Sequence, residues 1–516
     1  MTSRKEGSEY FGTESLQSDL KKKAIQGGGS MLISRTANLA IQFLSTVVLA
    51  RLLTPEDFGL VTMVTAFSLI FYNVGLNGFS EAIIQKERIT QAQVSTLFWI
   101  GLSISTALAV LFAVCSPLLA RFYKEPRLVP IAMALSIGFV FSALATEHIA
   151  LIMRNMQFKK LMVNEVVAGI LSTGIAIGMA LSGYAYWAVV ARHLSTPIFS
   201  AVFAWLQCSW RPGRPVKDPE IPGMVKFAAK TYANFFVRYV ERNSDKVLLG
   251  RRWGSQEVGN YDRAYYLFVM PANQLVVPLS GVALATLSRL HKEPPRYKLY
   301  YLKALSLLTL IGTLVSVIMT INGRDIILFV LGPQWGKTGV IFSALGPAIG
   351  ITVIYATIGW LHLSQGNPGR WLRWGTFAAA FTLVCLFLGL PYGALGVAVA
   401  YSLSFYVLTW PGIWYAAKPM GIRMREIWKA VWAYLAAAIA SGITISWVIN
   451  SVSVLSGFMG NAYVVVRIMI VTVLCTLLFF AVVIILSGGL KPVLEMVNLL
   501  RMMMPASRKA AKKTDA

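Results

Sequence analysis

Apolar runs of about twenty residues recur along the chain, separated by short stretches rich in charged residues, proline or glycine. A helix of about twenty residues crosses a hydrocarbon core of ~30 Å. Apolar and polar residues do not alternate over ~10-residue segments, which argues against an outer-membrane β-barrel. The pattern predicts an all-α polytopic membrane protein with about fourteen transmembrane helices. The predicted spans are 30–50, 58–80, 92–118, 128–148, 162–182, 185–207, 224–249, 257–286, 301–321, 338–362, 372–389, 392–416, 427–449 and 463–487.

A weak internal repeat relates the two nine-residue stretches 51–59 and 251–259. Three positions match at a constant offset of 200: Arg51 with Arg251, Asp57 with Glu257, and Gly59 with Gly259. The offset contains six predicted spans, an even number, so both copies have the same orientation. Parallel repeats are a transporter architecture that places the substrate site between the halves. A chance match in an apolar chain is the alternative.

The repeat suggests a division into two six-helix bundles followed by two additional helices. The predicted segments are a cytoplasmic N-terminal segment (1–29), the N-terminal bundle (30–207), a cytoplasmic linker (208–223), the C-terminal bundle (224–416), two additional transmembrane helices (417–490) and a basic cytoplasmic tail (491–516). The tail either lies against anionic lipid headgroups or is solvated.

Composition agrees with a membrane protein, since 56% of the residues are hydrophobic and 13% are charged. A soluble domain is about a quarter charged. The net charge of +25 would suit nucleic acid, but cytoplasmic loops of membrane proteins carry surplus Lys and Arg. With the N-terminus inside, 31 of the 47 basic residues fall on the cytoplasmic side and eight in the opposite loops. We therefore predict both termini in the cytoplasm and no nucleic-acid partner.

The remaining eight basic residues lie inside predicted spans, where charge is costly unless it faces water or a partner. They are Arg35, Arg192, Lys230, Arg238, Arg242, Lys246, Arg263 and Arg467. The acidic residues that accompany them are Glu165, Glu241, Asp245 and Asp262. A net positive cavity follows, and it suits an anionic substrate. Arginine suits phosphate in particular, because its planar guanidinium donates two parallel hydrogen bonds.

Helical phase groups polar side chains on four predicted spans. At about 100° per residue, the polar residues of the seventh span share one face. These are Lys230, Asn234, Arg238, Glu241 and Asp245. The first span groups Arg35, Asn38, Gln42, Ser45 and Thr46, the second Asn73, Asn77 and Ser80, and the eighth Arg263, Tyr266, Asn273 and Gln274. Two alternatives stay open: local i,i+3 pairing of Arg238 with Glu241 and of Arg242 with Asp245, and snorkelling of Arg35, Asp245 or Lys246 to the interface.

Motifs of enzymes are absent from the sequence. The four cysteines have no close pairing and no CxxC spacing, and the four histidines have no metal-ligand spacing. The chain has no Walker sequence, nucleophile elbow or HExxH. We therefore predict neither an enzyme nor a bound metal or cofactor.

Two motif blocks resemble a known family. The first is Leu-Ala-Arg-Leu-Leu-Thr-Pro-Glu-Asp-Phe-Gly over residues 49–59, preceded by Lys-Lys-Lys-Ala over 21–24. The second is Ser-Asp-Lys over 244–246, followed by Gly250, Gly259, Tyr261, Arg263, Ala264, Pro271 and Leu-Ser-Arg over 287–289. Over roughly residues 20–420 the chain resembles the polysaccharide transporter family, the Wzx-type lipid-linked oligosaccharide flippases of the MOP exporter superfamily. Its exopolysaccharide and colanic acid branch is the most similar.

The resemblance implies a V-shaped pair of six-helix bundles that work by alternating access in the bacterial inner membrane. The implied substrate is an oligosaccharide repeat unit on undecaprenyl pyrophosphate, moved to the periplasmic leaflet for exopolysaccharide or lipopolysaccharide synthesis. A polysaccharide polymerase and export machinery are the implied partners. The family does not assign the cavity residues, so helical phase alone suggests them. We expect Arg35, Lys230, Arg238, Arg242 and Arg263 at the pyrophosphate and Asn38, Gln42, Asn73, Asn77, Asn234, Tyr266, Asn273 and Gln274 at the sugars.

Glu241 and Asp245 are the candidates for coupling to a proton or sodium ion, or for holding the arginines in place. Other functions compete with this interpretation. A multidrug cation antiporter of the same superfamily would require an acidic cavity. A peptidoglycan-precursor flippase would differ by the lethality of its loss. A membrane glycosyltransferase or polymerase would require a large external loop or a pair of catalytic carboxylates.

Overall fold

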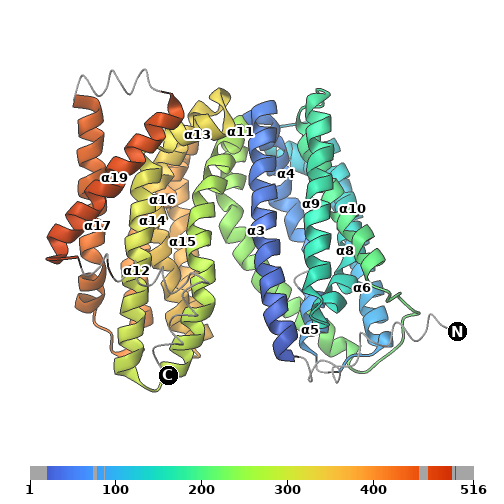
Figure 1. Ribbon diagram of the computed structural model, residues 1–516. Coiled ribbons are helices and arrows are strands. Elements are labelled where there is room, and N and C mark those ends of the chain that lie inside the picture. The colour runs from blue at the N-terminus through green and yellow to red at the C-terminus, as the bar shows by residue number, and fades with distance from the viewer. Residues whose placement is uncertain (1–19, 74–77, 87, 452–462, 491–493, 495–516) are drawn as a thin grey trace. The chain divides into compact units, whose positions relative to one another are not determined.

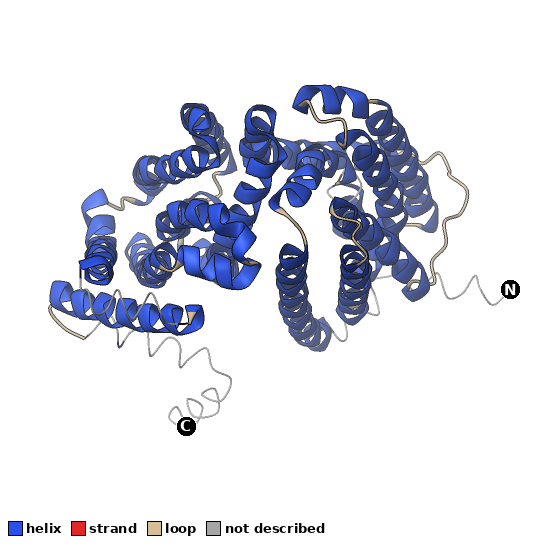
Figure 2. Cartoon of the chain, turned by 90° about the horizontal axis from the view of Figure 1, so that it is seen from above, coloured by secondary structure: helices blue, strands red, loops and turns tan. Residues whose placement is uncertain are grey.

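The computed structural model describes residues 20–73, 78–86, 88–451, 463–490 and 494. Helices connected by short loops make up these ranges, and none of the described residues forms a strand (Figure 2). Ten helical stretches among them are long and apolar enough to cross a membrane. The prediction of an all-α multi-pass membrane protein is therefore confirmed, while the count of fourteen crossings stays a prediction.

The chain forms two compact units, an N-terminal unit up to Asp262 and a C-terminal unit from Arg263. The predicted bundle borders at residues 207 and 416 stay predictions. In the N-terminal unit, α3 lies beside α9, and α8 packs against α6 and α10 (Figure 1). Its helices are α3 (Leu20–Leu52), α4 (Pro55–Tyr72), α5 (Ser80–Gln85), α6 (Gln91–Val114), α7 (Ser116–Tyr123), α8 (Leu128–Arg154), α9 (Phe158–Leu181) and α10 (Tyr186–Gln207).

Helix α11 (Ile221–Leu290) runs through the border between the units. Its backbone is not helical at Gly254, with φ 81° and ψ −175°, which divides it into a first segment (221–253) and a second segment (255–290). That region of backbone conformation is open almost only to glycine. The seventh and eighth predicted spans, 224–249 and 257–286, lie in these two segments.

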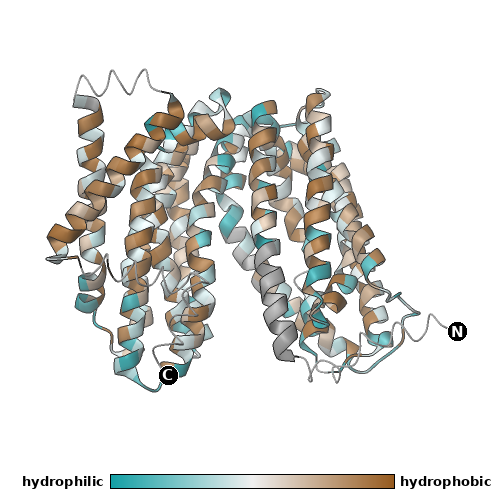
Figure 3. Cartoon of the chain, viewed as in Figure 1, coloured by the Kyte–Doolittle hydropathy of each residue, from teal (hydrophilic) through white to brown (hydrophobic). Residues whose placement is uncertain are grey.

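The C-terminal unit continues with α12, which packs against both α14 and α17. Its helices after α11 are α12 (Pro294–Ile321), α13 (Gly323–Leu331), α14 (Gly336–Ser364), α15 (Pro368–Gly389), α16 (Gly393–Ala417), α17 (Met424–Ser451) and α19 (Val464–Ser487). Apolar residues cover long stretches of α17 and α19, whereas α11 is more hydrophilic (Figure 3).

The motif Thr-Pro-Glu-Asp at residues 54–57 forms the start of α4. The Asp57 amide donates to Thr54 Oγ1 at 3.3 Å, and the Thr54 amide donates to Asp57 Oδ2 at 2.9 Å. Pro55 occupies the first turn, where a missing N–H costs nothing. The helix therefore satisfies its own N-terminal amides through a capping box.

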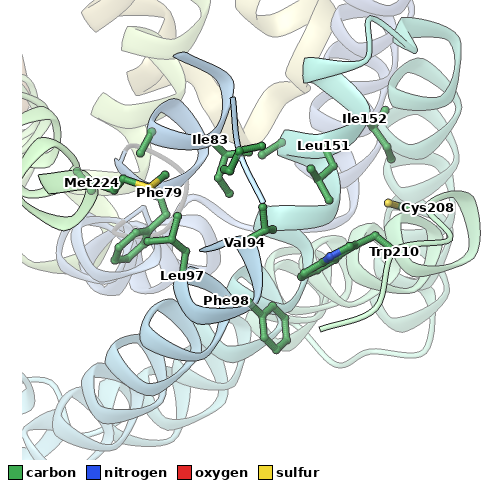
Figure 4. Close-up of a cluster of buried hydrophobic side chains, with 14 of the residues drawn as sticks. Phe79, Ile83, Val94, Leu97, Phe98, Leu151, Ile152, Cys208, Trp210 and Met224 are labelled. Atoms are coloured by element: carbon green, nitrogen blue, oxygen red, sulfur yellow. The ribbon is translucent and has the colours of Figure 1, made fainter. Parts of the chain in front are cut away.

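Residues 208–220 form an extended segment fixed along α6. The Trp99 indole donates to the Gly213 carbonyl at 2.9 Å, and the Val216 amide donates to Thr96 Oγ1 at 3.0 Å. Cys208 and Trp210 are fully buried in an apolar cluster with Phe98, which draws on α5, α6, α8 and the start of α11 (Figure 4). The predicted cytoplasmic linker is thus an ordered layer on one end of the N-terminal unit.

Side-chain bonds fasten α17 and α19 to the C-terminal unit at two places. The Arg467 guanidinium of α19 forms two hydrogen bonds with the Asp325 carboxylate of α13, and its Nε–Oδ2 distance is 2.6 Å. Lys298 of α12 pairs with Glu426 of α17. Because Arg467 meets a carboxylate, its charge inside a predicted span is explained by a partner rather than by a wet cavity.

We expect Arg467→Ala to lower the free energy of unfolding by about 1–3 kcal/mol, because it leaves Asp325 without this partner in a largely buried place. Thermal unfolding of the detergent-solubilised protein measures the effect. The neighbouring exposed Arg324→Ala is the matched control and should cost little. The double variant Asp325→Arg with Arg467→Asp should recover part of the loss. Equal losses for Arg467→Ala and Arg324→Ala would show that the pair contributes nothing.

Acid should release the 208–220 segment from α6. The Lys86 ammonium pairs with Glu220 and lowers the pKa of that carboxyl, and the Glu220 amide lowers the pKa of Asp218. Both groups therefore stabilise the segment above the ordinary carboxyl pKa and lose this effect as pH falls through their lowered values. The protection factors of residues 209–219 in hydrogen exchange, which correct for the intrinsic effect of pH on the rate, should fall across that acidic range.

Lys86→Met should make the same exchange faster at neutral pH and flatten its acid dependence, whereas exposed Arg88→Met should leave both unchanged. An unchanged profile for Lys86→Met would remove Glu220 as the cause.

Candidate functional site

The repeated stretches of the sequence meet in the structure, where the start of α4 crosses the second segment of α11. A methyl group built on Gly59 would lie 1.8 Å from the Ser255 carbonyl oxygen. One built on Gly259 would lie 1.8 Å from the Pro55 carbonyl oxygen. The two contacts are related by the offset of 200, so the crossing is a pseudo-two-fold arrangement of the repeats. Two glycines let the helix backbones approach this closely.

A buried polar network lies next to this crossing. Tyr261 donates its hydroxyl to Asp245 Oδ2 at 2.7 Å, and both residues are buried. Lys246 Nζ lies 2.7 Å from Asp262 Oδ1, and Thr62 Oγ1 lies 3.4 Å from Asp262 Oδ2. Asp245, which helical phase assigned to a water-facing stripe, is instead only 3% exposed. Lys246 meets a carboxylate rather than snorkelling to the interface.

Helix α3 presents a mixture of exposed and buried polar residues. Asn38 Nδ2 and Ser34 Oγ both donate to Glu165 Oε2 of α9, at 2.7 and 2.8 Å. Arg35 and Gln42 are exposed, whereas Ser45 and Thr46 are buried. The predicted polar arc of this span is therefore only partly open, because its C-terminal turn packs inside the unit.

The other predicted site residues of the N-terminal unit are placed differently from one another. Lys230 and Arg242 of α11 are exposed. Asn73 is half-buried at the end of α4, and its Nδ2 donates to the Leu69 carbonyl at 2.8 Å. Asn77 and the side chains of Asn234, Arg238 and Glu241 lie outside the described residues.

Four predicted site residues belong to the C-terminal unit. The Arg263 guanidinium lies 5.6 Å from the Tyr266 ring centroid, in cation–π contact, and both residues are half-buried. Asn273 and Gln274 are exposed on the same helix, α11. Arg263 and Tyr266, predicted for different parts of the substrate, therefore form one local pair.

Sequence reasoning missed a group of ionisable residues in the last turns of α8. Glu147 and His148 lie inside the predicted span 128–148, and Arg154 lies beyond its end although the helix continues to that residue. Glu147 is 2% exposed, and its Oε2 has no hydrogen-bond partner in the described part of the chain. His148 stacks on Trp205 with ring centroids 4.5 Å apart. Arg154 donates to the carbonyls of Ile83 and Lys86. An i,i+3/i+4 apolar pattern through residue 154 was the available signal.

The described residues contain no group of three or more His, Cys, Asp or Glu side chains placed to hold a metal ion. The candidate site consists instead of exposed cations and polar side chains on α3 and α11, a buried ion pair, and a close helix crossing. Exposed cations and polar side chains of this kind can bind an anionic, hydrogen-bonding ligand.

Comparison with solved structures identifies the fold. The chain is similar to the lipid II flippase MurJ in an inward closed conformation, with TM-score 0.71 and 15% identity over 90% of this chain and 99% of that one. It is also similar to a multidrug resistance MATE family transporter of the MOP superfamily in an inward-facing conformation, with TM-score 0.60 and 12% identity over 74% and 94% of the two chains. The MOP-type fold that the motifs imply is confirmed.

Proteins related to this chain in sequence are named for roles in polysaccharide biosynthesis. The lipopolysaccharide biosynthesis protein WzxC of Escherichia coli K12 is 20% identical over 80% of this chain and 85% of its own. The teichuronic acid biosynthesis protein TuaB of Bacillus subtilis 168 is 24% identical over 82% and 88%. Residues 48–339 match the family model described as polysaccharide biosynthesis protein, which is more than half of the chain. The chain therefore belongs to this family of polysaccharide biosynthesis proteins.

Proposed function

We propose that the protein is a flippase that moves oligosaccharide repeat units, linked to undecaprenyl pyrophosphate, from the cytoplasmic to the periplasmic leaflet of the bacterial inner membrane. Its family membership, which covers residues 48–339, is the observation that carries this proposal. The fold supports it, because the likeness to the lipid II flippase spans 90% of the chain. That structural neighbour, which is named for flipping lipid II, is similar to this chain over 99% of its own length.

The names of the relatives support a glycan substrate. WzxC and TuaB are named for lipopolysaccharide and teichuronic acid biosynthesis, and ExoT of Rhizobium meliloti, 21% identical over 64% of this chain and 67% of its own, is named a succinoglycan biosynthesis transport protein. These are different polymers. The precursors of different polymers can share one carrier lipid and differ in their oligosaccharide. The pyrophosphate is then the constant group that a transporter can recognise.

The exposed cations of the N-terminal unit suit that pyrophosphate. Arg35 of α3 and Lys230 and Arg242 of α11 are exposed, and each lies within a span predicted from the sequence. Arg238 and Arg263 complete the proposed phosphate-binding set. The proposed sugar contacts are Asn38, Gln42, Asn73, Asn77, Asn234, Tyr266, Asn273 and Gln274. Amide and hydroxyl groups of this kind hydrogen-bond sugar hydroxyls.

Asp245 supports a proposal of coupling to a proton or a sodium ion, together with Glu241. It is buried beside Lys246, and its oxygens accept from the Tyr261 hydroxyl and the Lys246 amide. A buried carboxyl in a membrane segment is a functional candidate because burying its charge is costly. Both termini are proposed to lie in the cytoplasm, where the basic residues concentrate, and a polysaccharide polymerase and export machinery to act after the flippase.

A multidrug cation antiporter is less well supported. The MATE likeness concerns the fold alone, and exposed Arg35, Lys230 and Arg242 would repel a cationic drug rather than bind it.

Deletion of the gene tests the proposed function. We expect loss of secreted polymer, with undecaprenyl-pyrophosphate-linked units accumulating in the cytoplasmic leaflet, measured by their accessibility to a membrane-impermeant lectin in spheroplasts and in inverted vesicles. Complementation with the intact chain is the control. Normal polymer would contradict the flippase function, and units that reach the periplasmic leaflet but stay unpolymerised would indicate a polymerase instead.

Charge on the exposed face should set the affinity for the pyrophosphate. Arg35→Ala and Lys230→Ala are each expected to reduce flipping several-fold, with Arg35→Lys keeping more activity than Arg35→Ala, because a phosphate contact is charge-assisted. Arg289→Ala, an exposed arginine near the end of α11 on the predicted cytoplasmic side, is the matched control. Membrane levels are checked by immunoblot. If all three alanine variants flip equally, the phosphate assignment fails.

A further inference from the structure

The crossing of α4 with α11 is a site where the two repeats touch through their backbones. Gly59 and Gly259 are the contact points, and neither has room for a methyl group. The neighbouring pair, Thr62 and Asp262, is again separated by 200 positions and joined by a hydrogen bond of 3.4 Å. Gly59 therefore meets Ser255 and Gly259 meets Pro55, the two glycines touch each other, and Thr62 bonds to Asp262 in the same closed arrangement.

We propose that this crossing opens and closes during transport, and that Gly59 and Gly259 are positioning residues that permit its closed state. The proposal rests on the proposed flippase function, since it assigns a moving part to that transport cycle. With the proposed orientation the crossing lies toward the periplasmic ends of the helices, next to Arg51 at the end of α3 and Arg251 at the end of the first segment of α11.

The polar groups at the crossing keep partners on their own helices when the helices separate. The N-terminus of α4 is capped by its own Thr54 and Asp57. Asp262 retains Lys246, and Asp245 retains Tyr261, all within α11. When the helices separate, the α4 amides and these two carboxylates therefore keep a partner. A contact in a membrane can open at low cost only under this condition.

None of the bonds between α11 and α4 described here is an ion pair. Tyr232 donates to the Ile70 carbonyl at 2.8 Å and Tyr239 to the Thr65 carbonyl at 3.1 Å, while Thr62 donates to Asp262. A hydroxyl–carbonyl bond contributes about 0.5–1.5 kcal/mol net, less than a buried ion pair costs to break. Charged contacts hold α11 together, and weaker contacts join it to α4.

A break in α11 lies between the two parts of the network. Gly254 has a positive φ of 81°, and a side chain built there would meet open space, so its glycine is needed for the backbone and not for packing. Because the break directly precedes Ser255, the second segment can change direction at the crossing itself.

A disulfide tests the proposal. Thr62→Cys with Asp262→Cys is made in a chain whose four native cysteines, at 115, 208, 385 and 475, are replaced by serine. It is reconstituted with undecaprenyl-pyrophosphate-linked units isolated from the deletion strain. We expect oxidation to stop flipping and reduction to restore it. Ser200→Cys with Asn164→Cys, which joins α10 to α9 inside the N-terminal unit, is the matched control and should flip in both states.

If the oxidised Thr62–Asp262 variant flips as fast as the reduced one, the crossing is static and the proposal is overturned. If that variant is inactive even when reduced, a second measurement decides. A single Thr62→Cys, at a position only 8% exposed, is labelled with a membrane-impermeant maleimide. Gly59→Ala and Gly259→Ala should each raise the labelling rate, because their methyl groups exclude the closed crossing, whereas Gly174→Ala, which meets open space, should not.

Equal labelling in all three glycine variants would also overturn the proposal. The labelling measurement needs no substrate. If the intact chain fails to flip the lipid-linked units, the proposed function fails, while the labelling rates still report whether the crossing opens.

Discussion

An ionised side chain inside a hydrocarbon layer needs a partner or water, and this constraint orders the charged residues of the protein. Lys246 meets Asp262, and Arg467 meets Asp325. Arg154 donates to main-chain carbonyls at the end of its helix. The first pair joins the two segments of α11 and the second joins α19 to α13, so the paired charges contribute to the scaffold. The cations that remain exposed, such as Arg35 and Lys230, are then the ones available to a ligand.

The helices were predictable because the length and hydrophobicity of each apolar run predict a helix without reference to the rest of the chain. Every predicted span overlaps a helix, and the Thr-Pro-Glu-Asp motif begins α4 as a capping box. The errors lie where tertiary contacts decide. Asp245 shares a helical face with Lys230, yet only one of them is exposed. Helical phase places a side chain on a face but does not say what covers that face.

Asp245 shows why the candidate site was harder to predict than the fold. Its hydrogen-bond donor Tyr261 lies sixteen positions along the chain, beyond the break at Gly254, and Asp262 meets Lys246 across the same break. Neither pairing follows the i,i+3 or i,i+4 spacing that a single helix allows. The weak repeat was the better guide, because Gly59 and Gly259 match in the sequence and touch in the structure.

Glycine at these two positions imposes the same steric constraint on both copies of the repeat. A methyl group is excluded by a main-chain oxygen on each side, so neither side can relieve the clash by rotating a side chain. Close packing through backbones gives a contact that is either fully made or absent, with no intermediate separation that keeps its van der Waals energy. A two-state contact of this kind, flanked by carboxylates that keep their own partners, suits a protein that must alternate between two arrangements more than one that must only be rigid.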